Sequence, residues 1–197
     1  MSRTVLKIIE AGQVRDSRTL VNERDLILAA QRGETAAFKD LYEGYKDRIF
    51  NLICYTLNDV HQAEDVLQSV FVKVFQALPF FRLESSFLTW IFRVALNECK
   101  NANRRRRIFT PFEAVHGETL DPAPGQDLVE SSRQLSRLLK EAVRRLKPKY
   151  RVVILLKYVE EMSYDEIAAA LSCSPGTVAS RLSRALEILH ERLRSFA

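Results

Sequence analysis

The chain has 197 residues, of which 47% are hydrophobic and 28% are charged, and its net charge is +5. This balance is typical of a folded globular protein and excludes a chain that is disordered throughout. No apolar run approaches the ~20 residues of a membrane-spanning helix, and the first residues lack the apolar core of a secretion signal. We therefore expect a cytoplasmic protein with no membrane insertion.

Charge is unevenly distributed along the chain. Residues 1–107 carry a net charge of +4, residues 108–130 carry −5, and residues 131–197 carry +6. The acidic stretch contains three of the six prolines, two of the six glycines and no Lys or Arg, which predicts a flexible linker. Two basic segments flanking an acidic linker indicate a polyanionic partner, although a solvated surface can also be basic. Residues 1–21 are expected to form an N-terminal extension.

Apolar residues recur with helical spacing on both sides of the linker. Before the linker, the pattern predicts two or three helices within residues 22–57, one over AEDVLQSVFVKVFQAL that ends before Pro79, and one that begins with Ser85 or Ser86 as its N-cap. After it, four helices are expected over residues 135–146, 150–159, 164–171 and 175–193. Alternating strand patterns are absent. The fold class is therefore predicted to be all-α, with two small helical domains over residues 22–107 and 131–197.

The segment from Met162 to Leu189 predicts a helix-turn-helix, because capping signals separate two short helical patterns. Ser163 and Glu166 have the spacing of a capping box, and Ser174-Pro175 supplies an N-cap and a first helical residue. One face of the second helix carries small and basic side chains suited to the DNA major groove. These residues are Thr177, Ala179, Ser180, Arg181, Ser183 and Arg184. The alternative is a solvated helix in a plain bundle.

A second segment, ALPFFRLESSFLTWIFRVALNECKNANRRRR, combines aromatic and basic residues. Aromatic rings stack on unpaired bases while cations hold the phosphates, so the combination favours binding of single-stranded nucleic acid. The loop over residues 79–86 is a candidate pocket for a base extruded from the duplex. The alternative for Phe87 and Trp90 is packing in the core. Asn97 and Asn101 lie one helical turn apart, which indicates either hydrogen bonds to a partner or a fraying helix end.

The sequence offers no pattern typical of an enzyme or a metal site. It has no Gly-rich phosphate loop and no plausible pair of nucleophile and base, and its three cysteines lie 45 and 74 residues apart. We therefore expect no catalytic residues, no metal and no cofactor, with the cysteines as small buried residues in a reducing compartment.

Three segments together resemble the extracytoplasmic-function (group IV) sigma factors of the sigma-70 family. They are AEDVLQSVFVKVFQAL, FRLESSFLTWIFRVALN with its basic tail, and LKPKYRVVILLKYVEEMSYDEIAAALSCSPGTVASRLSRALEIL. The resemblance covers roughly residues 25–107 and 135–193. It implies a bacterial transcription initiation factor with a sigma-2 domain that recognises the −10 element, and a sigma-4 domain that recognises the −35 element. Among several departures, Leu83 and Ser172 stand where the family often has glycine.

The resemblance also implies partners and their contact residues. The partners are core RNA polymerase, promoter DNA as duplex and as melted non-template strand, and an anti-sigma factor. Docking on the clamp helices of the largest polymerase subunit is implied for Asp65, Val66, Gln68 and Phe71, while the sigma-4 domain also contacts the β flap. The −10 residues implied are Phe81, Arg82, Ser85, Trp90, Arg93, Asn97, Lys100, Asn101, Arg104 and Arg105. The −35 residues are those named above on the second helix of the helix-turn-helix.

Three other functions are considered. A sigma-like decoy would titrate an anti-sigma factor without binding promoters, and it would have no need of Arg184, Asn97 or the arginines of residues 104–107. A dimeric helix-turn-helix repressor would have a dimerisation face, and none is evident. A nuclease or recombinase would have an acidic metal cluster, and none is evident. The sequence therefore favours an initiation factor.

Overall fold

A computed structural model describes residues 23–109 and 138–194 of the chain. These residues fall into two compact units, one on each side of the predicted linker, and neither contains a β-strand within the described ranges. The prediction of an all-α fold with two helical domains is confirmed. The predicted N-terminal extension, and the linker from residue 110 onward, lie outside the described residues. No helix in the described part of the chain is both long and apolar enough to cross a bilayer.

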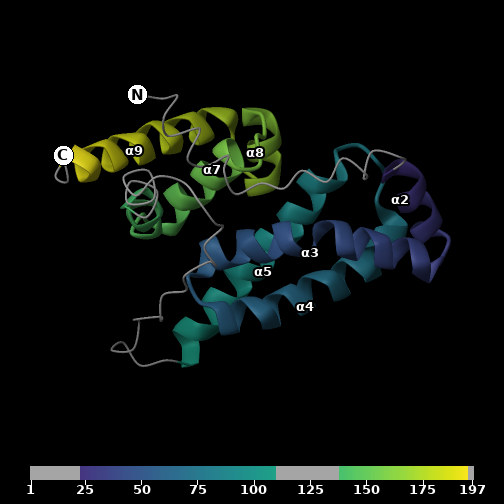
Figure 1. Cartoon of the computed structure of the whole chain (residues 1–197). Helices are drawn as coiled ribbons and strands as arrows, with labels where there is room; N and C mark the ends of the chain where they lie inside the picture. The colour runs from purple at the N-terminus through teal and green to yellow at the C-terminus, as the bar shows by residue number, and fades with distance from the viewer. Residues whose placement is uncertain (1–22, 110–137, 195–197) are drawn as a thin grey trace, which may run out of the picture. The chain divides into compact units, whose positions relative to one another are not determined.

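The N-terminal unit is built on three long helices (Figure 1). In chain order its elements are α2 (Glu23–Gln31), α3 (Thr35–Leu57), α4 (Val60–Ala77), the 3-10 turn η2 (Leu78–Phe80) and α5 (Phe87–Phe109). Helices α3, α4 and α5 pack against one another in pairs, and α2 packs on α3. The core of this unit is aliphatic and aromatic, with Ile49, Ile53 and Phe92 fully buried.

The break between α3 and α4 follows from two adjacent residues. Asn58 takes a left-handed conformation at φ 59° and ends α3, which Asn tolerates better than most residues. Asp59 then caps α4, its carboxylate accepting a hydrogen bond from the backbone N–H of Gln62 at 3.1 Å. These two residues let α3 and α4 pack side by side as a helical hairpin.

The C-terminal unit begins with helical residues 138–144 and continues with α7 (Pro148–Tyr158), α8 (Tyr164–Leu171) and α9 (Pro175–Arg194). Helix α9 packs on both α7 and α8. The predicted helix over residues 150–159 begins two residues earlier than expected, because Pro148 occupies the first turn of α7, where its missing N–H costs nothing. The helix predicted to end at residue 146 ends at residue 144, and its first residues, 135–137, are outside the described ranges.

The helix-turn-helix has the predicted boundaries. Ser163 and Glu166 form a complete capping box, in which each side chain accepts from the backbone N–H of the other residue at 3.2 and 2.8 Å. Helix α8 ends at Leu171, and Ser172 takes a left-handed conformation at φ 53°. The turn between α8 and α9 is three residues long, from Ser172 to Ser174. The first residues of α9, Pro175 and Gly176, are exposed.

Candidate nucleic-acid interface

The start of α9 is fixed by its N-cap residue. The Ser174 hydroxyl accepts a hydrogen bond from the backbone N–H of Thr177 at 3.2 Å, and the two hydroxyl oxygens lie 2.9 Å apart. Pro175 follows as the first helical residue, with its ring angle already suited to a helix. This cap fixes the direction in which the first two turns of α9 project from the unit.

Helix α9 divides into a buried and an accessible side. Val178, Leu182, Ala185 and Leu189 are buried against α7 and α8. The six residues predicted for −35 recognition are all accessible, with Ser180, Ser183 and Arg184 exposed and Thr177, Ala179 and Arg181 half-buried. The structure therefore brings the predicted residues together along the accessible side of one helix.

Polar contacts organise the side chains at the middle of α9. Arg184 Nη1 donates to Glu187 Oε2 at 2.8 Å, and the Ser183 hydroxyl lies 3.5 Å from the other oxygen of the same carboxylate. The hydrogen bond that Arg184 donates to Glu187 raises the pKa of Arg184, so this side chain remains charged. Nearer the N-terminus, the Ser180 hydroxyl donates to the Thr177 carbonyl at 3.0 Å. Glu187 thus holds Arg184 and also places a negative charge beside it.

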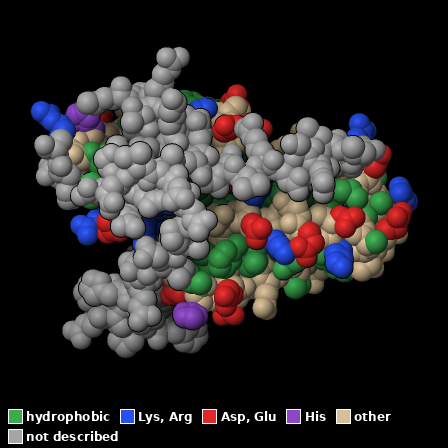
Figure 2. Space-filling model, in the orientation of Figure 1, with side chains coloured by type: hydrophobic (Ala, Val, Ile, Leu, Met, Phe, Trp, Pro, Cys, Tyr) green, Lys and Arg blue, Asp and Glu red, His purple; other side chains and the backbone are tan. Residues whose placement is uncertain are grey.

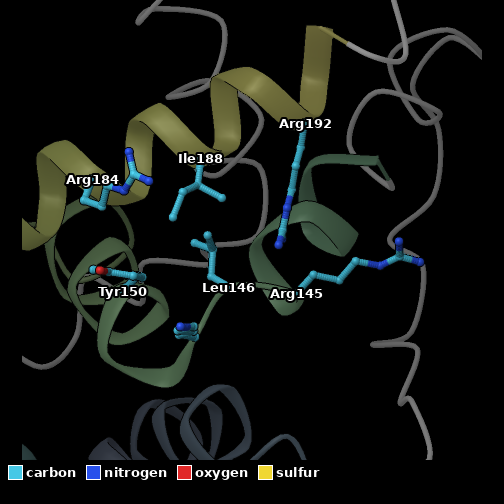
Figure 3. Close-up of a pocket in the computed structure, with 7 residues that line it drawn as sticks. Arg145, Leu146, Tyr150, Arg184, Ile188 and Arg192 are labelled. Carbon is cyan, nitrogen blue, oxygen red and sulfur yellow. The ribbon is translucent and has the colours of Figure 1, made fainter.

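A pocket of about 250 Å³ lies next to Arg184 in the C-terminal unit (Figure 3). Leu146, Tyr150 and Ile188 form its apolar part, and basic side chains surround it. The basic residues are Arg145, Lys147, Arg184 and Arg192. Arg192 donates from Nη1 to the Ala142 carbonyl at 3.1 Å, which ties α9 to the helical residues 138–144. The concentration of positive charge favours a phosphate or carboxylate near this surface.

The loop between α4 and α5 presents a different aromatic residue from the one predicted. Phe81 is only 8% exposed, because its ring packs on Trp90 at a centroid distance of 4.9 Å and on Phe87 at 5.8 Å. The ring of Phe81 is therefore largely covered by these two side chains, whereas the prediction placed it in contact with a base. Phe80, which was not among the predicted site residues, is 82% exposed. Because the chain leaves the helix at this turn, no helical periodicity indicates which of the two neighbouring rings, Phe80 or Phe81, is buried.

The loop contains one residue in a backbone conformation that favours glycine. Leu83, which stands where the family often has glycine, takes a left-handed conformation at φ 57°. For a non-glycine residue this conformation costs roughly 1–2 kcal/mol. Ser86 caps α5, its hydroxyl accepting from the Thr89 N–H at 3.1 Å. Ser85 and Arg82 remain exposed, so both predicted loop residues are accessible.

Along α5, the predicted residues form an exposed stripe and a partly buried group. Arg93, Asn97, Lys100 and Arg104 are exposed and follow one another at spacings of four, three and four residues, so they lie on one face of the helix. Arg105 is also exposed. Trp90 is half-buried through its contacts with Phe81 and with Phe87, which lies 5.6 Å away. The ring of Trp90 therefore packs against the aromatic side chains at both ends of the loop. It lies one turn before Arg93, the first residue of the exposed stripe.

Asn101 takes part in a hydrogen-bonded network within the unit. Its side-chain amide donates to Glu98 Oε1 at 3.0 Å, and the same oxygen accepts from Lys73 Nζ of α4 at 2.5 Å. Glu98 is buried, so its negative charge is balanced by these two donors. Part of the hydrogen-bonding capacity of Asn101 is thus used inside the protein, whereas Asn97 is exposed beside Lys100.

The predicted polymerase-docking residues of α4 lie on two different sides of the helix. Asp65 and Gln68 are exposed, but Val66 and Phe71 are buried, and Phe71 packs edge-on against Tyr42 at 4.7 Å. Val66 and Phe71 thus pack within the unit, whereas the prediction placed them in contact with the polymerase.

Two apolar residues on the accessible side of α4 were missed. Val72 and Phe75 are 56% and 57% exposed and continue the spacing of Asp65 and Gln68 along one face. Figure 2 shows hydrophobic side chains interspersed with charged ones on the visible surface of the N-terminal unit. The helical spacing of positions 65, 68, 72 and 75 is the sequence feature that indicates this exposed face of α4.

Two parts of the chain match family models, Sigma-70 region 2 over residues 41–108 and Sigma-70, region 4 over residues 136–189. "ECF RNA polymerase sigma factor SigW" of Bacillus subtilis (strain 168) is 32% identical over 178 residues, covering 85% of this chain and 95% of the relative. "ECF RNA polymerase sigma-E factor" of Escherichia coli (strain K12) is 31% identical over 185 residues, covering 88% and 95%. The structure of the sigma factor RpoE in complex with the anti-sigma factor NepR from Bartonella quintana matches with a TM-score of 0.66 and 25% identity, covering 80% of this chain and 96% of that one.

Proposed function

The chain belongs to the extracytoplasmic-function sigma factors of the sigma-70 family, and from this we propose that it binds core RNA polymerase, recognises −10 and −35 promoter elements and promotes DNA opening. The observation that carries the proposal is the presence of both family regions in one chain, each with an accessible basic face. Neither region alone would supply both anchoring and opening.

Recognition of the −35 element is assigned to the first turns of α9. Small side chains at Ala179, Ser180 and Ser183 let the helix approach the floor of the major groove, and Arg184 supplies a donor for a base edge. Glu187 and Glu191 would repel phosphates, so contact within the major groove ends near the middle of the helix. The basic residues around the neighbouring pocket support additional contacts to the DNA backbone, which strengthen binding without specifying sequence.

Recognition of the −10 element is assigned to the loop and the stripe on α5. Arg82 and Ser85 from the loop, with the four stripe residues, offer cations and amide groups to a single strand. Asn97 is the exposed amide of this set, while Asn101 contributes through the Glu98 network. Binding to unstacked bases offsets the cost of opening, because the sigma factor then favours the open DNA over the closed duplex.

Docking on the clamp helices of the polymerase is assigned to the accessible face of α4. Asp65 and Gln68 supply polar contacts there, and the exposed side chains of Val72 and Phe75 supply apolar contacts. Large exposed apolar residues on a helix face are typical of a protein-binding surface. Contact with the β flap is assigned to the C-terminal unit, without individual residues. The polymerase performs the nucleotide chemistry, so the chain itself is not an enzyme.

An anti-sigma factor is the further partner that we propose, and the cytoplasm is the compartment in which all these partners meet. The RpoE structure is a complex with such a factor, which supports this assignment. The same complex is compatible with the alternative function, a decoy that titrates an anti-sigma factor. The accessible Arg184 and the stripe on α5 favour promoter binding over the decoy, because a decoy does not need cations on these two faces.

The proposal is tested by transcription in vitro with purified bacterial core polymerase and a library of random promoters, with and without the protein. Transcripts that begin a fixed distance downstream of an enriched two-part motif would establish the function and supply both promoter elements. Binding to core polymerase or to an anti-sigma protein without such transcripts would favour the decoy. Binding to neither would contradict both functions.

The division of labour between the two units is tested by two variants on a recovered promoter. Arg184→Ala should weaken binding to the duplex −35 element by about 1–3 kcal/mol, because it removes a base-edge donor. Asn97→Ala should reduce DNA opening, measured by permanganate reactivity of unpaired thymines, with duplex anchoring unchanged. Both variants should bind core polymerase like the unmodified chain. A similar loss of polymerase affinity in both would contradict the assignment.

A further inference from the structure

Glu98 is a buried carboxylate on α5 that joins α4 to the side chains assigned to −10 binding. Its side chain is 11% exposed, and its Oε1 accepts hydrogen bonds from Lys73 Nζ at 2.5 Å and from the Asn101 amide at 3.0 Å. Both donors contact the same oxygen, so the carboxylate is held from two directions. Burying an acid is costly even when it is paired, and an apolar residue of similar volume would pack there without that cost. This comparison indicates a role for Glu98 beyond packing.

The charge of Glu98 decides which end of the Asn101 amide faces outward. An ionised carboxylate only accepts hydrogen bonds, so the NH2 end of the amide must face Glu98. The carbonyl oxygen then points away from Glu98, because the two ends lie on opposite sides of one planar group. In the described part of the chain this oxygen has no hydrogen-bond partner and is not enclosed by protein. Asn101 is therefore fixed as a hydrogen-bond acceptor toward its surroundings.

The position of Asn101 on α5 makes this acceptor available to a bound strand. Asn97 and Arg105 are exposed and lie one turn before and one turn after the half-buried Asn101, on the same face. Asn97 is held less firmly than Asn101, because its carbonyl oxygen lies 3.5 Å from Nζ of the exposed Lys100, a long contact that lets the amide turn. Of the two amides, Asn101 is therefore the one that can distinguish a donor from an acceptor.

We propose that Glu98 is a positioning residue for base selection: it holds the Asn101 carbonyl outward, as an acceptor for an exocyclic amino group of the −10 strand. This inference rests on the proposed function and adds to it a residue that does not itself touch DNA. Adenine and cytosine carry such an amino group, whereas guanine and thymine carry a carbonyl at the corresponding ring position. Two facing carbonyl oxygens repel each other, so the arrangement favours adenine or cytosine. Lys73 holds the Glu98 carboxylate and has no direct part in the selection.

The test compares four variants of the full chain, each assembled with core polymerase: Asn101→Ala, Glu98→Met, Glu98→Gln and Lys73→Ala. Transcription of the promoter library with the unmodified chain and with Asn101→Ala identifies the strand position whose base preference depends on Asn101. The probes are fluorescein-labelled single strands with the non-template −10 sequence of a recovered promoter. At this position they carry either the preferred base or the same base without its amino group. Fluorescence anisotropy gives the two Kd values, and their ratio measures recognition of the amino group.

The variants separate positioning from packing. Glu98→Met fills a similar volume but offers no acceptor, so the Asn101 amide is free to turn. Glu98→Gln keeps an oxygen that can accept from both donors. Lys73→Ala breaks the same contact between α4 and α5 but leaves the Glu98 acceptor in place. Urea titrations give the stability of each variant, and a separate titration gives its affinity for core polymerase.

With the unmodified chain, removal of the amino group is expected to raise the Kd about 2- to 10-fold, the effect of one net hydrogen bond. This difference should disappear in Asn101→Ala and Glu98→Met, and it should persist in Glu98→Gln and Lys73→Ala even where their stability is lowered. An equal loss of the difference in Lys73→Ala and Glu98→Met would show that Glu98 acts only through packing, and would overturn the inference. A preference for guanine or thymine at this position, or a library preference that Asn101→Ala leaves unchanged, would also overturn it. Failure of the unmodified holoenzyme to bind the strand would overturn both this inference and the proposed function.

Discussion

The two adjacent serines before α5 are predicted to have different roles, which a pair of alanine variants separates. Ser86 is the N-cap: its hydroxyl accepts from the Thr89 N–H at 3.1 Å and lies 2.8 Å from the Thr89 hydroxyl. Ser85 is exposed in the loop assigned to −10 binding. Ser86→Ala should therefore destabilise the N-terminal unit, and Ser85→Ala should instead weaken DNA binding.

The magnitude follows from the contacts that each change removes. Replacing an N-cap serine by alanine costs typically about 1 kcal/mol. Because Thr89 is buried, the change also removes a partner of its hydroxyl, and the cost rises toward about 2 kcal/mol if that group stays unpaired. In a domain of this size, 1 kcal/mol lowers the melting temperature by about 4–8 °C. Ser85→Ala makes no such change and should stay within about 0.5 kcal/mol of the unmodified chain.

The fluorescence of Trp90 allows the N-terminal unit to be followed on its own. Trp90 is the single tryptophan of the chain, and its ring packs against Phe81 and Phe87 at the end of α5 that Ser86 caps. Urea titrations monitored at this residue give the free energy of unfolding for each variant without interference from the C-terminal unit. Binding of each variant holoenzyme to the single-stranded −10 probe supplies the second measurement.

Two results would refute this reasoning. If Ser86→Ala left the urea midpoint unchanged, the hydroxyl would not act as the cap in solution. If Ser85→Ala lowered the midpoint as much as Ser86→Ala, the start of α5 would lie one residue earlier. The reasoning also requires that Ser86→Ala, once folded and assembled, binds the strand better than Ser85→Ala does.

Three further predictions concern local backbone and titration properties. Ser172→Gly should raise the melting temperature of the C-terminal unit by circular dichroism, because relief of about 1–2 kcal/mol of left-handed strain exceeds the added chain entropy; a lower melting temperature would contradict it. Hydrogen bonds from Ser163, the backbone one foremost, lower the pKa of Glu166 below 4.5. The ionised carboxylate therefore stabilises the fold above about pH 4.5, and this contribution is lost as pH falls through the lowered pKa. Glu166→Gln should cost about 0.5 kcal/mol at pH 7 and progressively less as the pH falls below 4.5; an unchanged cost across this range would refute the assignment. Burial raises the pKa of the Cys99 thiol to about 12, so iodoacetamide at pH 8 should modify it in urea but not in the folded protein, as measured by mass spectrometry.

The parts of the structure that sequence reasoning predicted most accurately are those determined by neighbours in the chain. The capping box of α8 and the Ser174-Pro175 start of α9 depend on hydrogen bonds spanning three residues. The accessible side of α9 follows from its periodicity, because most of its polar and apolar residues separate into two faces, with Leu186 as an exposed exception. In these places the local chemistry and the tertiary contacts favour the same arrangement.

The predicted docking residues of helix α4 lie on two sides of an amphipathic helix. Its polar residues, such as Asp65, Gln68 and Gln76, lie on the exposed side, and Val66 and Phe71 lie on the buried side. Phe71 packs there against Tyr42 of α3. The contact joins positions far apart in the chain, but the helical periodicity of α4 already indicates that Phe71 lies on the buried side. No such periodicity separates Phe80 from Phe81, whose contacts with Trp90 and Gln31 come from distant parts of the chain or from the next helix.

At two positions where the family often has glycine, this chain takes a left-handed backbone conformation with a larger residue. Leu83 and Ser172 both take left-handed conformations, at φ 57° and 53°. At Leu83, the closed turn and anchored ring of Phe81 fix one end of the loop, and the Ser86 cap fixes the other. Four residues between fixed ends leave the chain few paths, so the left-handed conformation is imposed at a cost of about 1–2 kcal/mol. Glycine removes this cost without changing the path, whereas Leu83 adds a half-buried apolar side chain to the recognition loop. We therefore expect Leu83→Gly to change base preference at the −10 element while the backbone path of the loop is kept.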